Sequence, residues 1–364
     1  MTNPSMIDLF AGCGGMTVGF SDEGFEPVLA VEWDKFAAAT YAANFGEDHV
    51  RAGDIAEVKN SEIPRVDLVI GGPPCQGFSN LGLKRLDDPR NQLWREYMRF
   101  IAKAKPKVFV VENVDRFSKS PEFQMLLAET EQGVLKGYQI SFGVLNAADY
   151  GVPQRRRRTI VIGSRVGKIE LPPATHAKSP IDDNLLPWTT VRDAIWGLPE
   201  SPESNALPDS ATQFFGEDMP GVFKARDIHF RRDPRPLSLA RYDAVPPGGG
   251  RFDIPRELLP RCWREKPTGT TDVMGRMRWD APSLTIRTEF FKPEKGAYLH
   301  PQWEEDPTQR VNRVITHLEA SRLQDFPQDF LWVGTKIAIA KQIGNAVPSG
   351  LARAIAAQIK PYVS

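Results

Sequence analysis

The chain lacks any apolar run approaching the roughly 20 residues of a membrane span, so no membrane helix is expected within its 364 residues. The N-terminus has no basic region followed by an apolar core, which predicts no signal peptide and a cytoplasmic protein. Cysteine is scarce, since Cys13, Cys75 and Cys262 form no even disulfide framework. A reducing compartment fits this usage and would keep Cys75 a free thiol.

Metal-ligand patterns and a net charge are also missing. The five histidines are scattered and no CxxC or HxxxH pair occurs, so no bound metal is expected. The 46 Lys and Arg balance 46 Asp and Glu, but distribution matters more than the total for a nucleic-acid binder. Residues 221–287 contain fourteen basic and eight acidic side chains, and residues 155–158 are all arginine. Taken alone, either cluster is as consistent with a solvated surface as with a nucleic-acid footprint.

Short apolar runs alternate with helical stretches over the first 165 residues, which predicts an α/β fold with a doubly wound parallel sheet. The expected strands are residues 6–10, 28–31, 66–70, 108–111 and 159–162, and the expected helices are residues 34–44, 92–103 and 122–132. From about residue 170, proline and glycine become frequent and periodicity fades, which predicts a second, irregular domain. Helical pattern returns at residues 318–325 and 351–360, and we expect the last helix to cover the sheet flank beside the first strand.

The most informative segment is the run Gly-Gly-Pro-Pro-Cys-Gln-Gly-Phe-Ser at residues 71–79. It follows the expected strand at residues 66–70, and loops at the carboxyl ends of such strands are where α/β folds hold ligands. Two prolines fix φ and remove backbone donors, so the loop is stiff where Cys75 lies. A rigidly presented thiol suits a nucleophile, although a small buried residue is the commoner state of a lone cysteine.

Glycines and carboxylates after the first strands indicate a nucleoside site. The run Asp-Leu-Phe-Ala-Gly-Cys-Gly-Gly at residues 8–15 allows a tight turn and close approach of a ligand, although an ordinary turn would also use these glycines. Glu32 lies about 20 residues further on, where a carboxylate can bind ribose hydroxyls. Trp33 offers a flat surface for adenine, and Asp54-Ile55 could read the base edge. Together these residues suit an adenosine ligand without requiring a pyrophosphate.

Charged residues at two further strand ends suit chemistry on a ring. Glu112 follows residues 108–111, on the rim expected for Cys75, where a carboxyl can protonate a ring nitrogen. A carboxylate at a helix N-terminus is the ordinary alternative. Arg156 and Arg158 share one face of an extended chain, and guanidinium groups can bind a carbonyl oxygen or a phosphate.

In order and spacing, these motifs resemble those of DNA cytosine-5 methyltransferases of the bacterial restriction–modification type. The resemblance covers the whole chain and includes the runs Glu-Ala-Ser-Arg-Leu-Gln-Asp-Phe-Pro at residues 319–327 and Gln-Ile-Gly-Asn-Ala-Val-Pro at residues 342–348. One departure precedes the first of these runs, where His317-Leu318-Glu319 replaces the usual Arg-Glu pair.

The resemblance implies a Rossmann-like class I methyltransferase sheet with a smaller target-recognition domain. Residues 1–175 would form the catalytic domain that binds S-adenosylmethionine, residues 176–300 the recognition domain, and residues 301–364 a return to the catalytic domain. It also implies double-stranded DNA as partner, no membrane, a monomer, and a cognate restriction endonuclease as a further possible partner.

The resemblance further implies roles for single residues. Cys75 would attack C6 of a flipped-out cytosine, Glu112 would protonate N3, Arg158 would polarise O2 and Arg156 would support the loop. C5 would then accept the methyl group of S-adenosylmethionine. Residues 78–95 would form a lid, with Asn80 or Leu81 filling the space left by the base. The expected cofactor-binding residues are Phe10, Gly12, Gly14, Glu32, Trp33, Asp54, Ile55, Pro74, Leu93, Asn345 and Val347.

Two alternatives to DNA methylation share these motifs. The tRNA-methylating branch of the family uses the same catalytic residues, but a sizeable region rich in arginine and aromatic residues favours DNA. A catalytically inactive DNA-binding relative is the other alternative, and intact Cys75, Glu112 and Arg158 argue against it. A zinc-dependent base deaminase is excluded by the missing metal-ligand pattern.

Overall fold

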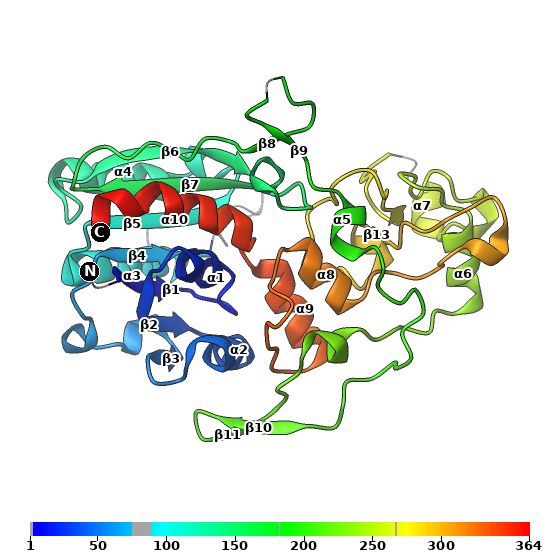
Figure 1. Cartoon of the computed structure of the whole chain (residues 1–364), viewed down its shortest axis with the longest axis horizontal. Helices are drawn as coiled ribbons and strands as arrows, with labels where there is room; N and C mark the ends of the chain where they lie inside the picture. Colours follow the sequence, from blue (N-terminus) through cyan, green and yellow to red (C-terminus); the bar gives the residue numbers. More distant parts are fainter. Residues whose placement is uncertain (1–2, 75–88, 182, 266–267) are drawn as a thin grey trace.

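A seven-stranded sheet forms one side of the molecule in this computed structural model, which describes residues 3–74, 89–181, 183–265 and 268–364 (Figure 1). The strand order is β3-β2-β1-β4-β5-β7-β6. Strands β1 to β5 run parallel, whereas β7 is antiparallel to β5 and β6. The strands are β1 (Ser5–Leu9), β2 (Glu26–Glu32), β3 (Val50–Ala52), β4 (Leu68–Gly71), β5 (Val108–Val114), β6 (Gln139–Asn146) and β7 (Arg157–Ser164).

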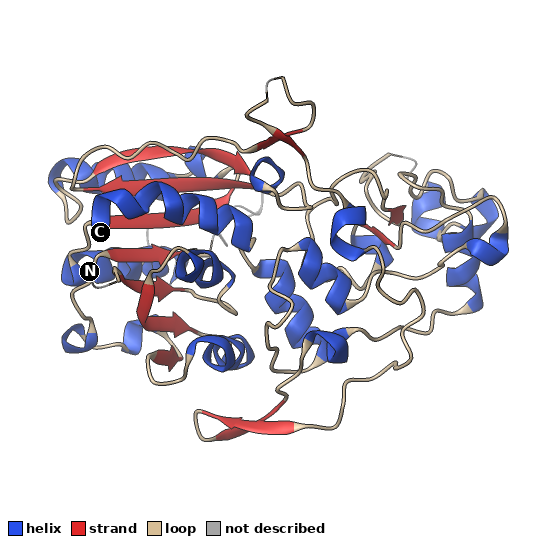
Figure 2. Ribbon diagram, in the orientation of Figure 1, coloured by secondary structure: helices blue, strands red, loops and turns tan. Residues whose placement is uncertain are grey.

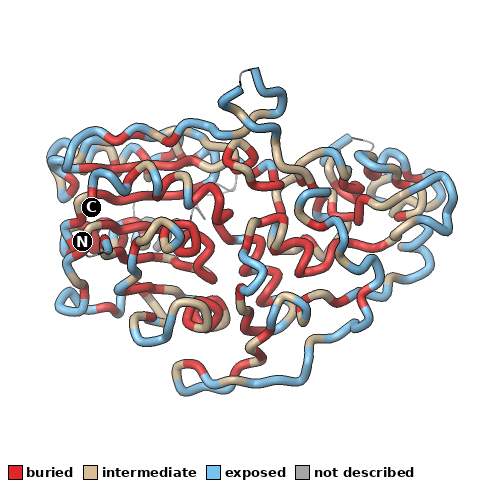
Figure 3. Tube along the Cα trace, viewed as in Figure 1, coloured by how far each residue is buried: buried red, intermediate tan, exposed pale blue. Residues whose placement is uncertain are grey.

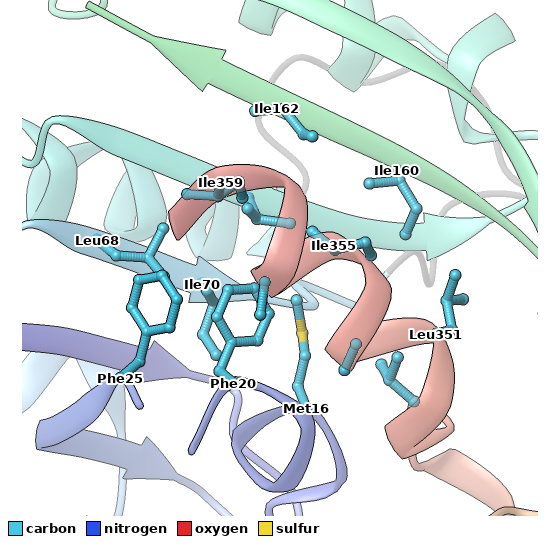
Figure 4. Close-up of a cluster of buried hydrophobic side chains, with 14 of the residues drawn as sticks. Met16, Phe20, Phe25, Leu68, Ile70, Ile160, Ile162, Leu351, Ile355 and Ile359 are labelled. Atoms are coloured by element: carbon cyan, nitrogen blue, oxygen red, sulfur yellow. The ribbon is translucent and has the colours of Figure 1, made fainter. Parts of the chain in front are cut away.

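Helices cover both faces of this sheet. They are α1 (Gly15–Asp22), α2 (Lys35–Phe45), α3 (Pro89–Ala104), α4 (Pro121–Gln132) and the C-terminal α10 (Ser349–Val363). On one face, α1 and α10 bury apolar side chains against the strands, as Met16, Phe20, Ile70 and Ile355 show in Figure 4. Aromatic side chains of α3 and α4 fill the other face. The expected return of the last helix to the sheet is therefore confirmed.

The rest of the chain forms a less regular lobe beside the sheet (Figure 2). Its elements are short: β8 (His176–Ala177), β9 (Leu186–Pro187), α5 (Val191–Ile195), β10 (Ala211–Phe214), β11 (Glu217–Pro220), α6 (Pro236–Asp243), α7 (Arg261–Glu265), β12 (Gly275–Arg276) and β13 (Ala297–Leu299). Helices α8 (His317–Leu323) and α9 (Lys336–Asn345) lie between this lobe and the sheet, and buried chain runs along both (Figure 3). Their side chains share one hydrophobic cluster with Phe223, Phe290 and Tyr298 of the lobe. The boundaries at residues 175 and 300 stay a prediction.

A buried arginine, Arg276, joins several loops of the irregular lobe by hydrogen bonds. Arg276 donates hydrogen bonds to the carbonyl oxygens of Tyr242, Val245 and His300 at 2.6–2.8 Å and to Asn312 Oδ1 at 2.8 Å. Burial lowers its pKa to about 10, so it stays charged near neutral pH. Charge-assisted hydrogen bonds to loop carbonyls are stronger than neutral ones. One side chain thus fixes several loops that lack a β-ladder.

A buried ion pair lies where the sequence departs from the family pattern. Glu319, at the start of α8, is fully buried and accepts two hydrogen bonds from Arg313, at 2.7 and 2.8 Å. It also accepts from the backbone N–H of Thr316, at 2.7 Å. Burial alone would raise the pKa of Glu319, but Arg313 and this N–H lower it to about 2. Arg313 is therefore the cation that balances the buried charge of Glu319.

Replacing Glu319 with glutamine is expected to destabilise the fold by about 3–5 kcal/mol, because Arg313 would be left buried without a carboxylate. The contribution of Glu319 is complete above its unfolded pKa of 4.5 and is lost as pH falls through about 2. Urea unfolding at pH 7 and at pH 3 measures both effects, and the variant should lose less stability over that interval than the native protein. Glu217→Gln, which breaks the exposed Lys35–Glu217 pair, is the matched control and should cost less than about 1 kcal/mol. Equal losses for both variants would contradict the assignment.

Candidate active site

A cavity of about 810 Å³ lies at the carboxyl ends of β1, β2, β4 and β5, and residues of α9 and of the irregular lobe complete its walls. This is the edge at which an open α/β sheet binds its ligands. Most of the site residues expected from the sequence meet here. Those that line the cavity are Phe10, Gly12, Glu32, Trp33, Asp54, Ile55, Pro74, Leu93, Glu112, Arg156, Arg158, Asn345 and Val347. Cys75 and residues 78–88 of the expected lid, including Asn80 and Leu81, lie outside the described residues.

Gly14 supports the cavity without lining it. It is the N-cap of α1 with φ of 91°, a left-handed conformation that favours glycine, and a Cβ there would lie 2.4 Å from the Phe45 ring. One turn later, Thr17 donates a hydrogen bond to Asp8 at 2.6 Å. Burial raises the pKa of Asp8 to about 7. These contacts fix the turn between β1 and α1.

Glu32 is held rigidly at the end of β2. Its two carboxylate oxygens accept hydrogen bonds from the backbone N–H groups of Gly12 and Asp34, both at 2.8 Å. Burial raises the pKa of Glu32, and the two N–H groups oppose that shift. Each oxygen retains a further lone pair for a ligand. Asp54 is held through one oxygen, which caps a short helix by accepting from the Ala56 N–H at 2.9 Å.

Trp33 lines this cavity and is 72% exposed, which is a large exposed surface for an aromatic side chain. For the S-adenosylmethionine ligand that the sequence resemblance implies, we expect Trp33→Ala to weaken binding about tenfold, because stacking of an aromatic side chain on a base contributes about 1–3 kcal/mol. Titration calorimetry measures the affinity. Trp196→Ala is the matched control, since Trp196 is 60% exposed but does not line the cavity. Unchanged affinity in Trp33→Ala would argue against stacking on adenine.

Glu112 and Arg158 form an ion pair in the same cavity, with Nε and Oε1 at 2.9 Å and both side chains largely buried. Glu112 lies inside β5, which continues to Val114, three residues beyond the expected end of the strand. Pairing of β5 with β7 brings the two residues together. A Cβ at Gly72 would lie 3.2 Å from Glu112 Oε2, so glycine leaves room beside the carboxylate.

Arg156 fastens the two sides of the cavity to each other. Its guanidinium donates to the carbonyl oxygens of Ile286, Gly344 and Asn345 at 3.1–3.3 Å. Burial lowers its pKa to about 9, which still leaves it charged near neutral pH. Asn113 makes a similar tie, because its amide donates to Pro73 O at 2.8 Å. The end of β5 is thereby attached to the segment that leads to Cys75.

A family model described as C-5 cytosine-specific DNA methylase matches residues 5–361 of the chain. The chain belongs to this family. Its activity is accordingly methyl transfer to C5 of cytosine in DNA. The Type II methyltransferase M1.HphI of Haemophilus parahaemolyticus is 34% identical over 362 residues, covering 96% of this chain and 85% of that relative. M.XorII of Xanthomonas oryzae pv. oryzae is 36% identical over 372 residues, covering 99% and 85%.

Solved structures confirm the expected fold class for this cytosine-5 methyltransferase. A DNA modification methyltransferase encoded within an E. coli prophage superposes with a TM-score of 0.70 at 26% identity, covering 98% of this chain and 99% of that one. The S. pombe Dnmt2 methyltransferase superposes with a TM-score of 0.61 at 19% identity, covering 98% and 99%, and supports the fold alone.

One wall of the methyltransferase cavity was not expected from the sequence. Thr285, Ile286, Arg287 and Thr288 line it, and Lys341 of α9 does so as well. The segment belongs to no helix or strand, and hydrogen bonds to residues 154–156 and to Tyr298 hold it in place. Three of the four residues at positions 285–288 are β-branched, and this enrichment was the available sequence signal for an extended segment.

Neither a metal-binding cluster nor a membrane helix is present among the described residues. Among them, no group of three or more His, Cys, Asp or Glu side chains is placed to hold a metal ion. No helix within the described ranges is long and apolar enough to cross a bilayer. Of the described cysteines, Cys13 is buried, which raises its thiol pKa, and Cys262 is exposed.

Proposed function

We propose that the chain methylates C5 of a flipped-out cytosine in a short, specific duplex sequence. S-adenosylmethionine would be the methyl donor, and a bond between Cys75 and C6 would form the covalent intermediate. We further propose that the chain is the modification enzyme of a restriction–modification system, as the Type II names of its relatives suggest. The observation that supports the reaction most directly is a single cavity that holds Glu112 and Arg158 together with Glu32 and Trp33.

The nucleoside end of the cavity fits S-adenosylmethionine. A volume of about 810 Å³ lies within the range of small-molecule sites. No atom lies within 4 Å of the position that a Cβ on Gly12 would take, so a ligand can approach the backbone there. Glu32 presents free lone pairs to ribose hydroxyls, and Trp33 presents a flat face to adenine. When bound, S-adenosylmethionine supplies an electrophilic methyl group.

The Glu112–Arg158 pair matches one edge of cytosine, where N3 and O2 are adjacent. Glu112 would give a proton to N3 and Arg158 would donate a hydrogen bond to O2, so that the ring can accept electrons. The Cys75 thiolate would then add to C6, which makes C5 nucleophilic toward the methyl group. A base would then take the C5 proton, Cys75 would leave as the thiolate, and N3 would return its proton to Glu112, which restores the aromatic ring.

The substrate and its surroundings follow from this chemistry. A base within a duplex cannot reach such a cavity, so it must be flipped out, as methyltransferases of this kind do. We propose residues 176–300 as the recognition domain, since Thr285 to Thr288 reach the cavity from that part of the chain. A monomer in the cytoplasm, with a restriction endonuclease that cuts the same sequence as partner, completes the proposal.

The decisive experiment is sequencing of genomic DNA for 5-methylcytosine, from cells that express the chain and from cells that express Cys75→Ala. Methylation at one short motif, absent from the Cys75→Ala cells, would support reaction, substrate and nucleophile together. Methylation in both would exclude Cys75 as nucleophile. No methylation in either would overturn the DNA assignment, and tRNA would then be tested as substrate.

A further inference from the structure

Four residues of the irregular lobe, Thr285 to Thr288, form the cavity wall that faces the ends of the strands. They belong to no helix or strand, so hydrogen bonds from elsewhere must hold the segment in place. The position of this wall bears on the reaction, because Glu112 and Arg158 line the same cavity from the sheet side.

Gln154 and Arg156, which precede strand β7, hold the centre of this segment. The Ile286 N–H donates to Gln154 Oε1 at 2.9 Å, and the Ile286 carbonyl accepts from Arg156 at 3.1 Å. Helix α9 lies against the end of the segment, since a Cβ at Gly344 would be 2.3 Å from Thr288 N. These contacts fix Ile286 and Thr288.

Tyr298 holds the residues on either side of Ile286. Its hydroxyl accepts a hydrogen bond from the Arg287 N–H at 3.2 Å and donates one to the Thr285 carbonyl at 3.1 Å. Tyr298 lies on β13 and is 1% exposed, and a Cβ at Gly296 would be 2.6 Å from its ring, so the ring has little room to move. Burial raises the pKa of Tyr298 to about 12, so the hydroxyl keeps its proton at working pH.

We propose that Tyr298 is a positioning residue for methyl transfer, whose hydroxyl holds Thr285 and Arg287 so that the wall meets the target cytosine at a fixed distance from Glu112 and Arg158. The inference rests on the proposed assignment of this cavity to the reacting base. Without the hydroxyl, the partly buried Thr285 carbonyl and Arg287 N–H lose this partner and the segment relaxes. A displacement of about 1 Å at a reacting site can cost about a hundredfold in rate.

Tyr298→Phe tests the proposal by removing one oxygen atom and leaving the ring in place. At saturating duplex DNA and S-adenosylmethionine, we expect kcat to fall by about tenfold to a hundredfold. Affinity for S-adenosylmethionine should change less than about twofold, since the contacts at Glu32 and Trp33 are untouched. Tyr138→Phe is the matched control, because the Tyr138 hydroxyl donates to Pro106 O at 2.6 Å and does not line the cavity.

The comparison of kcat with stability separates positioning from a merely structural role. Thermal unfolding of both variants should show similar small decreases in Tm, and only Tyr298→Phe should lose kcat. Equal kcat in the two variants, or a kcat of Tyr298→Phe equal to that of the native protein, would overturn the positioning role and leave the proposed function standing. A native protein that methylates no duplex DNA would instead overturn the proposed function.

Discussion

Cys75→Ser is expected to lower methyl transfer by more than about a thousandfold, because a serine hydroxyl without an adjacent base is a poor nucleophile toward C6. A cysteine thiol ionises in part near neutral pH, whereas the hydroxyl does not. S-adenosylmethionine should still bind with native affinity, since Glu32 and Trp33 are unchanged. Transfer of a labelled methyl group to duplex DNA measures the first effect, and titration calorimetry measures the second.

Cys262→Ser is the matched control for that experiment. Cys262 is exposed on α7 and does not line the cavity, so this variant should keep native activity. If Cys75→Ser retained activity close to that of the control, Cys75 would not be the nucleophile. If both binding and transfer were lost, the segment at residues 71–79 would instead be needed for the cofactor.

The strands that the sequence predicts well are those buried on both faces. Strand β4 and the start of β5 are continuous apolar runs, as parallel strands covered by helices must be. Strand β6 went unpredicted because it lies at the sheet edge, where Phe142 and Val144 are exposed and Gly143 interrupts the pattern. Helix α1 was also missed. Its Gly19 weakens helix propensity, but a Cβ there would lie 2.4 Å from Arg353 N of α10.

The part of the site at the strand ends could be predicted from the sequence, whereas the part formed by segments far apart in the sequence could not. Glu32 and Glu112 could be placed together because the carboxyl ends of parallel strands meet at one edge. The wall at Thr285 to Thr288 could not, because its position results from contacts with residues 154–156, which are 130–132 residues away, and with Tyr298, which is 11–13 residues away. The Arg313–Glu319 pair was also not predicted, since Arg313 lies outside the regular elements and no sequence pattern joins it to helix α8.

Glu112→Gln is expected to lower kcat by about 10²–10⁴-fold, the range of a lost general acid, because an amide can hydrogen-bond N3 but cannot give it a proton. S-adenosylmethionine should still bind, since Glu112 pairs with Arg158 and not with Glu32 or Trp33. Rapid-quench measurement of one turnover on duplex DNA isolates the chemical step. Glu131→Gln, on the exposed face of α4, should behave as the native protein does.

A fall in rate alone would not separate proton transfer from a structural role, because the substitution also leaves Arg158 without its carboxylate at 2.9 Å. A buried cation without a partner destabilises the fold, so a structural role predicts a large fall in Tm together with the fall in rate. If Glu112 transfers the proton, the folded Glu112→Gln variant should still turn over slowly at every pH when it is assayed well below its Tm. If instead lowering the temperature restored the native rate, Glu112 would act only by holding Arg158, and the proton for N3 would have to come from another group.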